Sequence, residues 1–326
     1  MITHTVDHGW GMEWPIKVLE QSILNTYLAP VMADNSRTVV INSTWYGEQQ
    51  HSSTIQWLRY NDWDQIVLVS MIDATIPQPT WYQEFDRPVL AVGNYDGDHN
   101  IVFWAHVLNQ HFILPDVRAD IDTAFMCLNR KPHWHRLRLY RQMESRGLLA
   151  KGLVSMGGDA DSQARRVITE SVIENNLAPN GQAQYHGITN DIVSLGDPYN
   201  WRRCFLNVVT ETIYDISQRH FVSEKIFKPM LGHRPFLVYA TDGATLWLDQ
   251  YGFQNYTKDF RDITDLDLGL PENMVAFLEI LSTQPRSYLE HKIIDLADKI
   301  SYNHNRFREF VREQQLKIQK GIQCQI

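Results

Sequence analysis

The segment HFVSEKIFKPMLGHRPFLVY, residues 220–239, predicts a helix followed directly by a buried strand. Ser223 is a favourable N-cap, because its hydroxyl can accept from the free backbone amides of the first turn. Glu224 suits the positive end of a helix dipole, whereas Lys225 and Lys228 do not. A lysine there is explained most simply by an anion that binds it together with the backbone amides. The segment therefore predicts an anion site, of the kind that holds phosphates, at a helix N-terminus.

Short apolar runs, several of them rich in β-branched residues, alternate with stretches that can be helical along most of the chain. The predicted strands are residues 38–43, 65–70, 88–92, 124–128, 152–156, 205–209 and 236–239. This alternation is typical of parallel sheets covered by helices on both faces. We expect an α/β fold of two Rossmann-like domains, residues 1–118 and 119–326, in which the second domain ends in a helical tail.

The helices are expected from apolar periodicity and from their end signals. In the first domain they are residues 52–60 and 101–112. In the second they are residues 132–146, with Pro132 in the first turn and Gly147 as the C-cap, then 167–176, 244–251 and most of the chain after Pro271. Two apolar stripes are expected to face the core of the tail, Met274/Phe277/Leu278/Leu281 and Leu289/Ile293/Ile294/Ala297.

The bulk composition describes an ordinary globular protein. The 326 residues carry a net charge of −8, which disfavours general nucleic-acid binding but allows a local anion site. The three cysteines are far apart and show neither a disulfide framework nor a zinc spacing. No signal segment opens the chain, and no run approaches the about 18 apolar residues of a membrane-spanning helix. A cytoplasmic protein without a membrane span is expected.

A second strand-to-helix corner repeats the pattern of basic residues near a helix start. Residues 128–136 leave a predicted strand with Asn129 and Arg130 and open a helix that carries Arg136. In an open parallel sheet, ligands bind beyond the carboxyl ends of the strands, and both corners lie there. The joint hypothesis is a diphosphate held between them. The alternative is that each corner carries only solvated surface charge.

Carboxylates near these corners offer further chemistry. Glu211 follows a predicted strand at the same edge and can accept from sugar or ribose hydroxyls; the alternative is an N-cap or a salt bridge to Lys225. In the first domain Asp96, Asp98 and Glu48 are candidates for a general base.

Other chemistries are disfavoured by the motifs. Four Asp-x-Asp triplets occur at 62/64, 96/98, 159/161 and 265/267, but loop and cap chemistry explains them, so no metal site is expected. The chain has no Gly-x-Gly-x-x-Gly, Walker or Gly-x-Ser-x-Gly motif. This disfavours a nicotinamide enzyme, a P-loop NTPase and an α/β-hydrolase.

Taken together, residues 209–212 (VTET), 221–229 (FVSEKIFKP) and 128–140 (LNRKPHWHRLRLY) resemble the donor-site region of α1,3-fucosyltransferase-like glycosyltransferases. The similarity covers residues 125–253. Thr212, Ser223 and Pro229 depart from the family's usual residues.

The resemblance implies a GT-B fold, in which two Rossmann-like domains face a cleft and the nucleotide sugar sits on the C-terminal domain. By motif match Lys225 and Arg136 would bind the donor phosphates, and Glu224 would contact the donor. The full set of expected donor-binding residues is Asn129, Arg130, Arg136, Glu211, Ser223, Glu224, Lys225 and Lys228.

The predicted function is transfer of a sugar from a nucleoside diphosphate sugar to a glycan or glycoconjugate hydroxyl, with GDP-fucose as one candidate donor. Inversion of the anomeric centre without a metal or other cofactor is expected. Two alternatives stay open. One is a nucleotide-sugar or glycan-binding module without turnover. The other is a phage-type enzyme that glycosylates DNA bases.

Overall fold

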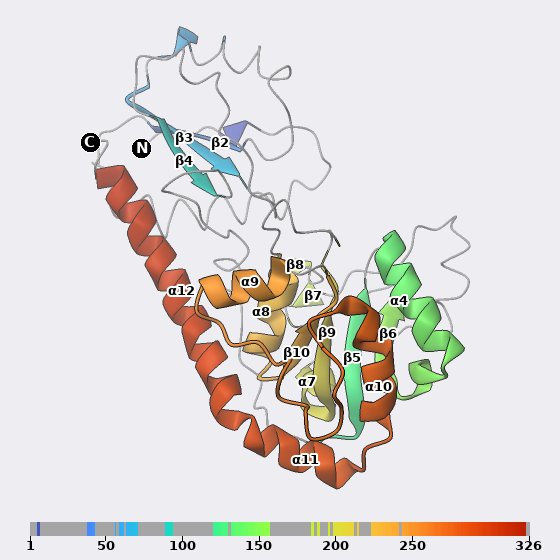
Figure 1. The fold of residues 1–326 in the computed structure, drawn as a ribbon. Helices are drawn as coiled ribbons and strands as arrows, with labels where there is room; N and C mark the ends of the chain where they lie inside the picture. Colours follow the sequence, from blue (N-terminus) through green and yellow to red (C-terminus); the bar gives the residue numbers. More distant parts are fainter. Residues whose placement is uncertain are drawn as a thin grey trace. The chain divides into compact units, whose positions relative to one another are not determined.

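The structure is a computed structural model, and its elements can be followed in Figure 1. It describes residues 5–6, 38–42, 56, 59–61, 63–70, 89–93, 120–129, 132–156, 184–185, 188–189, 195, 198–211, 214, 223–240 and 243–323. The chain divides into two compact units, residues 1–109 with 309–326 and residues 110–308.

The first unit contains a four-stranded parallel sheet in the order β1-β2-β3-β4. Its strands are β1 (Thr5–Val6), β2 (Thr38–Asn42), β3 (Gln65–Ser70) and β4 (Val89–Gly93). The three strands predicted here from β-branched runs are confirmed. The base candidates Glu48, Asp96 and Asp98 lie outside the described residues, as does the helix expected at 101–112.

The second unit is built on a four-stranded parallel sheet in the order β10-β9-β5-β6. Its strands are β5 (Thr123–Asn129), β6 (Gly152–Met156), β9 (Cys204–Val209) and β10 (Phe236–Val238). Every residue of β9 is buried, so both faces of this strand are covered, as expected for a strand inside a parallel sheet. A short antiparallel pair, β7 (Gln184–Tyr185) and β8 (Ile188–Thr189), is separate from this sheet.

The helix expected at residues 167–176 lies outside the described residues, and the one observed at residues 198–203 was not predicted from the sequence. Helices lie between and after the strands of this sheet. They are α4 (Trp134–Ser145), α7 (Pro198–Arg203), α8 (Glu224–Leu231), α9 (Gly243–Gln250), α10 (Met274–Ser282), α11 (Arg286–Asp295) and α12 (Ala297–Gln323), with 3-10 turns η4 (Leu148–Ala150) and η6 (Pro271–Asn273). Pro132 was expected in the first turn of this helix. It instead precedes His133, the N-cap of α4, and lies outside the helix. Gly147 follows the helix at φ 67°, the left-handed conformation that glycine favours after a helix end.

The two predicted apolar stripes have different outcomes. Met274, Phe277, Leu278 and Leu281 of α10 are all buried, so that prediction is confirmed. The second stripe is wrong in part, because Ile294 is 70% exposed although Leu289 is buried. Both residues lie in α11, where Ile294 follows Leu289 by five positions and is therefore about 140° away around the helix, so the two side chains cannot share one face. Ala297, the last member of the expected stripe, is also exposed and begins α12.

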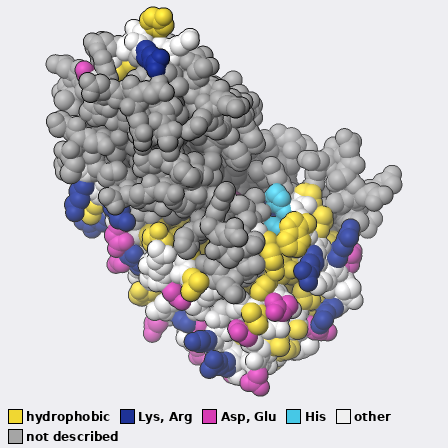
Figure 2. Space-filling view, turned by 45° about the horizontal axis from the view of Figure 1, so that its top comes forward, with side chains coloured by type: hydrophobic (Ala, Val, Ile, Leu, Met, Phe, Trp, Pro, Cys, Tyr) yellow, Lys and Arg dark blue, Asp and Glu magenta, His cyan; other side chains and the backbone are white. Residues whose placement is uncertain are grey.

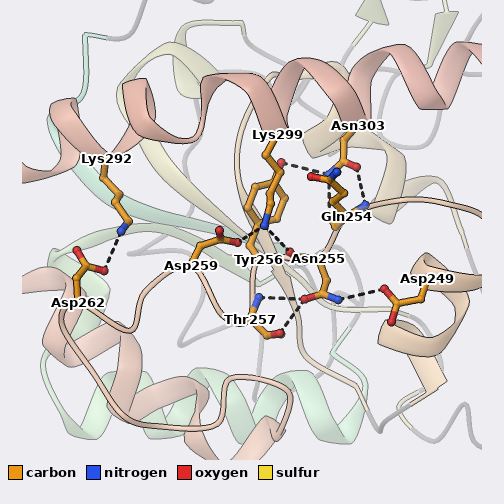
Figure 3. A network of polar contacts seen from close by, with 10 residues as sticks. All are labelled: Asp249, Gln254, Asn255, Tyr256, Thr257, Asp259, Asp262, Lys292, Lys299 and Asn303. Atoms are coloured by element: carbon orange, nitrogen blue, oxygen red, sulfur yellow. Dashed lines mark hydrogen bonds and ion pairs between the residues drawn. The ribbon is translucent and has the colours of Figure 1, made fainter.

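A polar network fastens the loop after α9 to α12 (Figure 3). The buried Asn303 side chain accepts from the Gln254 amide and donates to the Gln254 carbonyl, both at 2.8 Å. It also donates to the Tyr256 hydroxyl at 3.2 Å. One turn away, Lys299 forms an ion pair with Asp259 at 2.6 Å. The Asn303 side chain thus supplies hydrogen-bond partners for the backbone amide and carbonyl of Gln254, which lies in a loop.

The buried Arg234 ties the start of β10 to the end of α7 through backbone carbonyls. Its guanidinium donates to the carbonyls of Cys204, His233 and Arg202 at 2.6, 2.8 and 3.0 Å. Burial lowers the pKa of Arg234 to about 10, so the side chain stays charged. The carbonyls that end α7 carry the negative pole of a helix dipole, which a cation complements.

Among the helices in the described part of the chain, none combines the length and the apolar character needed to cross a membrane.

Candidate functional site

The carboxyl ends of β5 and β9 place Asn129 and Thr210 side by side. The Thr210 hydroxyl donates to the Asn129 side-chain oxygen at 2.5 Å, and the Asn129 amide donates to the Ser155 carbonyl at 3.3 Å. Asn129 and Thr210 are both buried. Asn129, predicted from the sequence as a donor-binding residue, therefore joins three parallel strands at their ends.

Helix α4 is held against the same edge by two side chains of its first turn. Arg136 donates to the Thr210 carbonyl at 2.9 Å, and His135 Nε2 lies 2.9 Å from the Glu211 carbonyl. Because a carbonyl only accepts, His135 carries its proton on Nε2. Burial lowers the pKa of His135 to about 4, so the ring is neutral near pH 7.

Arg136 was expected to bind a phosphate, and the geometry favours a different role. The residue is only 2% exposed, and it spends a guanidinium donor on the backbone after β9. Arg136 therefore positions the loop that carries Glu211. Arg130, the other basic candidate of this corner, lies outside the described residues.

The Glu211 side chain contacts Ser223, the N-cap of α8. Its two carboxylate oxygens accept from the hydroxyl and the amide of Ser223, at 2.5 and 3.3 Å. Glu211 is 1% exposed, and burial raises its pKa. The geometry thus favours the capping alternative over direct binding of sugar hydroxyls, because the carboxylate supports the cap of α8.

Ser223 passes this interaction on to Lys225. Its hydroxyl caps α8 as predicted, accepting from the Lys225 amide at 3.3 Å. The Lys225 ammonium also donates to this hydroxyl and pairs with Glu224, both at 2.9 Å. Burial alone would raise the pKa of Glu224, but the neighbouring Lys225 and Lys228 keep it below its usual value. The sequence suggested that a bound anion balances the positive charge of Lys225. The Glu224 carboxylate supplies part of that negative charge.

Exposure distinguishes the charged groups of this corner. The Glu224 side chain is 8% exposed, whereas that of Lys225 is 25% exposed and open to a ligand. Lys228 lies in the last turn of α8, where the dipole favours a cation. The expectation that Lys228 stands in an unfavourable first turn is therefore wrong, because α8 is only eight residues long.

Sequence reasoning missed an aromatic group at this edge. Tyr214 lies between Trp134, His135 and Tyr239, with ring centroids 5.1, 5.4 and 5.4 Å away. Trp134 is 62% exposed, although indole rings normally bury most of their surface. Figure 2 shows hydrophobic side chains next to a histidine on an open face of the second unit. In the sequence, the sign of this aromatic group was the pair Trp134 and His135 directly before Arg136.

A cavity of about 470 Å³ lies at the opposite edge, where β5 and β6 begin. Its lining includes Arg203 and Arg286, but both are already paired with carboxylates. Arg203 contacts Asp122 at 2.8 Å, and Arg286 contacts Asp120 at 2.6 Å. This cavity does not belong to the corner at the carboxyl edge.

No group of three or more metal-ligating side chains occurs within the described ranges. One member of the Asp-x-Asp triplets has an evident local role, because Asp267 accepts from the Gly269 amide at 3.0 Å within a turn. This turn-stabilising role is the one expected for an Asp-x-Asp triplet in a loop.

The described residues define an α/β protein with parallel sheets, in which polar side chains from two strand-to-helix corners meet at one carboxyl edge. No protein-family model matches the chain, and no curated protein matches it. Among solved structures, it is similar to one titled "Crystal Structure of alpha1,3-Fucosyltransferase with GDP", at 10% identity and a TM-score of 0.36, over 90% of this chain and 95% of that chain. A likeness of this size leaves the function to be argued from the residues themselves.

Proposed function

We propose that this protein is a glycosyltransferase that moves a sugar from a nucleoside diphosphate sugar to an acceptor hydroxyl. The observation that carries the proposal is the chain of contacts Lys225–Ser223–Glu211–His135, which joins the two corners at one sheet edge. Ligands of open parallel sheets bind beyond the carboxyl ends of the strands. A partly exposed ammonium at a helix N-terminus there suits a diphosphate.

In this mechanism Lys225 stabilises the charge that grows on the leaving diphosphate as the glycosidic bond breaks. Such stabilisation is strongest when the cation is already in place before reaction. Ser223 supplies that preorganisation, because its hydroxyl accepts from the ammonium while it donates to Glu211. Glu211 and Ser223 are therefore positioning residues, and Lys225 is the group that touches the donor.

The finer features of the reaction are proposals on the same basis. A carboxylate of the first half, Asp96, Asp98 or Glu48, removes the proton of the acceptor hydroxyl. Direct displacement inverts the anomeric carbon, and Lys225 takes the role that a metal has in other transferases. Fucose from GDP-fucose is the first donor to test.

The test measures nucleotide binding and turnover together. GDP and UDP binding is followed by calorimetry, and diphosphate release is followed with a panel of nucleotide sugars and acceptors. Losing a charged contact costs about 1.5–3 kcal/mol, so Lys225→Ala should weaken nucleotide binding by about 10- to 150-fold. The matched control is Lys258→Ala, an exposed lysine in the same unit, which should bind as the wild type does.

Two outcomes would contradict the proposal in different ways. Nucleotide binding that is unchanged in Lys225→Ala would remove the donor site from this corner. Tight binding without diphosphate release across many acceptors would identify a binding module instead of an enzyme.

A further inference from the structure

The exposed aromatic group beside the corner has a cation at helical spacing. Trp134 and Arg138 are four residues apart on α4, so their side chains lie on the same helix face. Both are exposed. Tyr214 lies beside them: its ring is 5.1 Å from that of Trp134, and the charge of Arg138 acts on its hydroxyl. An open indole, a phenol and a guanidinium thus form one surface, which we call the Trp134 platform.

The platform is firmly built. The Tyr239 and Tyr214 hydroxyls share a hydrogen bond, and the centroids of the two rings lie 5.4 Å apart. On the helix side, His135 meets both Trp134 and Tyr214 and bonds to the Glu211 carbonyl. The exposed indole therefore has partners on its inner side and presents the rest of its surface to solvent.

The platform is also connected to the proposed diphosphate site through His135 and Glu211. Trp134 is followed immediately by His135, which contacts the Glu211 backbone, and the Glu211 carboxylate holds Ser223 at the start of α8. A ligand whose phosphates meet Lys225 thus has an aromatic surface within the same hydrogen-bonded unit.

From these observations we infer that the Trp134 platform binds the nucleobase of the donor nucleotide by stacking. This inference rests on the proposed function and deepens it. Every base offers a π-face, and stacking on an aromatic side chain contributes strongly to nucleotide affinity. The cation Arg138 favours a nucleotide over a neutral acceptor sugar, because a local positive charge attracts an anion even on a protein whose net charge is −8. Since stacking reads no hydrogen-bonding edge, the platform supplies affinity and leaves the choice of base to other contacts.

The test compares ligands with and without a base. Dissociation constants of GDP, ADP, UDP and inorganic pyrophosphate are measured by calorimetry for the full chain and for its variants. Trp134→Ala should weaken the three nucleotides by about 5- to 100-fold, the range for loss of one stacked base. Its pyrophosphate affinity should not change. Trp134→Phe should keep much of the nucleotide affinity, and Lys225→Ala should weaken both kinds of ligand.

A matched control is Tyr199→Ala on α7, an aromatic residue that is 56% exposed and belongs to the other sheet edge. It should leave all four dissociation constants unchanged. Arg138→Gln should weaken the nucleotides, with less effect at high salt, because a surface charge is screened.

Three results would overturn the inference. Nucleotide affinity that is the same in Trp134→Ala and the wild type would remove the base from this surface while the diphosphate site stands. An equal loss for pyrophosphate would show that the indole supports only the fold of the corner. A wild-type protein that binds no nucleotide at all would refute the proposed function and this inference with it.

Discussion

Acidification from pH 7 to pH 5 should destabilise this protein mainly through buried histidines. Burial lowers the pKa of both His135 and His233 to about 4, from 6.5 in the unfolded chain. The folded state therefore holds these rings neutral, and the unfolded state takes up a proton first as the pH falls. Stability from this source is full above pH 6.5 and is lost as the pH falls toward the folded pKa.

The size of the effect follows from proton linkage. With pKa values of 6.5 and about 4, one histidine costs about 1.8 kcal/mol of unfolding free energy between pH 7 and pH 5. His135 is almost fully buried and should show this value. His233 is only partly buried, so screening by solvent reduces its share to about 1 kcal/mol.

The surroundings explain why neither ring is stabilised in its charged form. Positive charge on Arg136 disfavours protonation of His135. His233 stacks on His304, with ring centroids 4.2 Å apart, and Arg234 and Arg308 add like charge. A carboxylate beside either ring would reverse the sign.

The assay is urea unfolding at pH 7 and pH 5, followed by tryptophan fluorescence. His135→Gln should lose about 1.8 kcal/mol less than the wild type over this interval. For His233 the better substitution is Asn, since the residue has φ 50°, a conformation that asparagine tolerates. Glu211 has a raised pKa and gains stability on acidification, which is why differences between variants are compared instead of totals. If His135→Gln loses as much stability as the wild type, the reasoning from burial is refuted.

Two further predictions concern packing and buried hydrogen bonds. Asn303→Ala leaves the amide and carbonyl of Gln254 without their partner and should lower the free energy of unfolding by about 2–4 kcal/mol in urea titration, whereas the exposed Asn305→Ala should change it by less than about 0.5 kcal/mol. Equal effects of these two changes would contradict the role of the network. Gly232→Ala would place a methyl group against the buried ring of Trp201, closer than van der Waals contact allows, and should cost about 2 kcal/mol or more. Unchanged thermal stability would mean that the ring moves aside at no cost.

Much of the secondary structure could be predicted from short stretches of sequence. The β-branched run within residues 65–70 predicted β3 at its observed bounds, because such side chains fit a buried pleated surface wherever the strand is placed. Ser223 was recognisable as an N-cap for a similar reason, since capping depends on a hydroxyl next to free amides. Ile294 was misplaced because it follows Leu289 by five positions in α11, and residues at that spacing lie on different faces of a helix.

The roles of the corner residues needed the tertiary structure. From the sequence, Glu211 and Arg136 were open to a ligand, since a carboxylate and a guanidinium at a strand end suit sugar and phosphate. In the folded protein both side chains are buried, and they bind Ser223 and the Thr210 carbonyl. A charged group removed from water must find hydrogen-bond partners inside the protein. Trp134 shows the reverse case, an aromatic residue that the helix leaves in solvent.

By itself the sequence determined the alternating elements, the cap of α8 and the lysine beside it, all of which depend on residues within one or two turns. Only the tertiary structure decided which strand ends meet, that Ser223 links Glu211 to Lys225, and that Trp134 and Tyr214 share a surface. The contacts Glu211–Ser223 and Trp134–Tyr214 join separate segments of the chain, and the order β10-β9-β5-β6 that brings these segments together is set by the packing of the whole sheet.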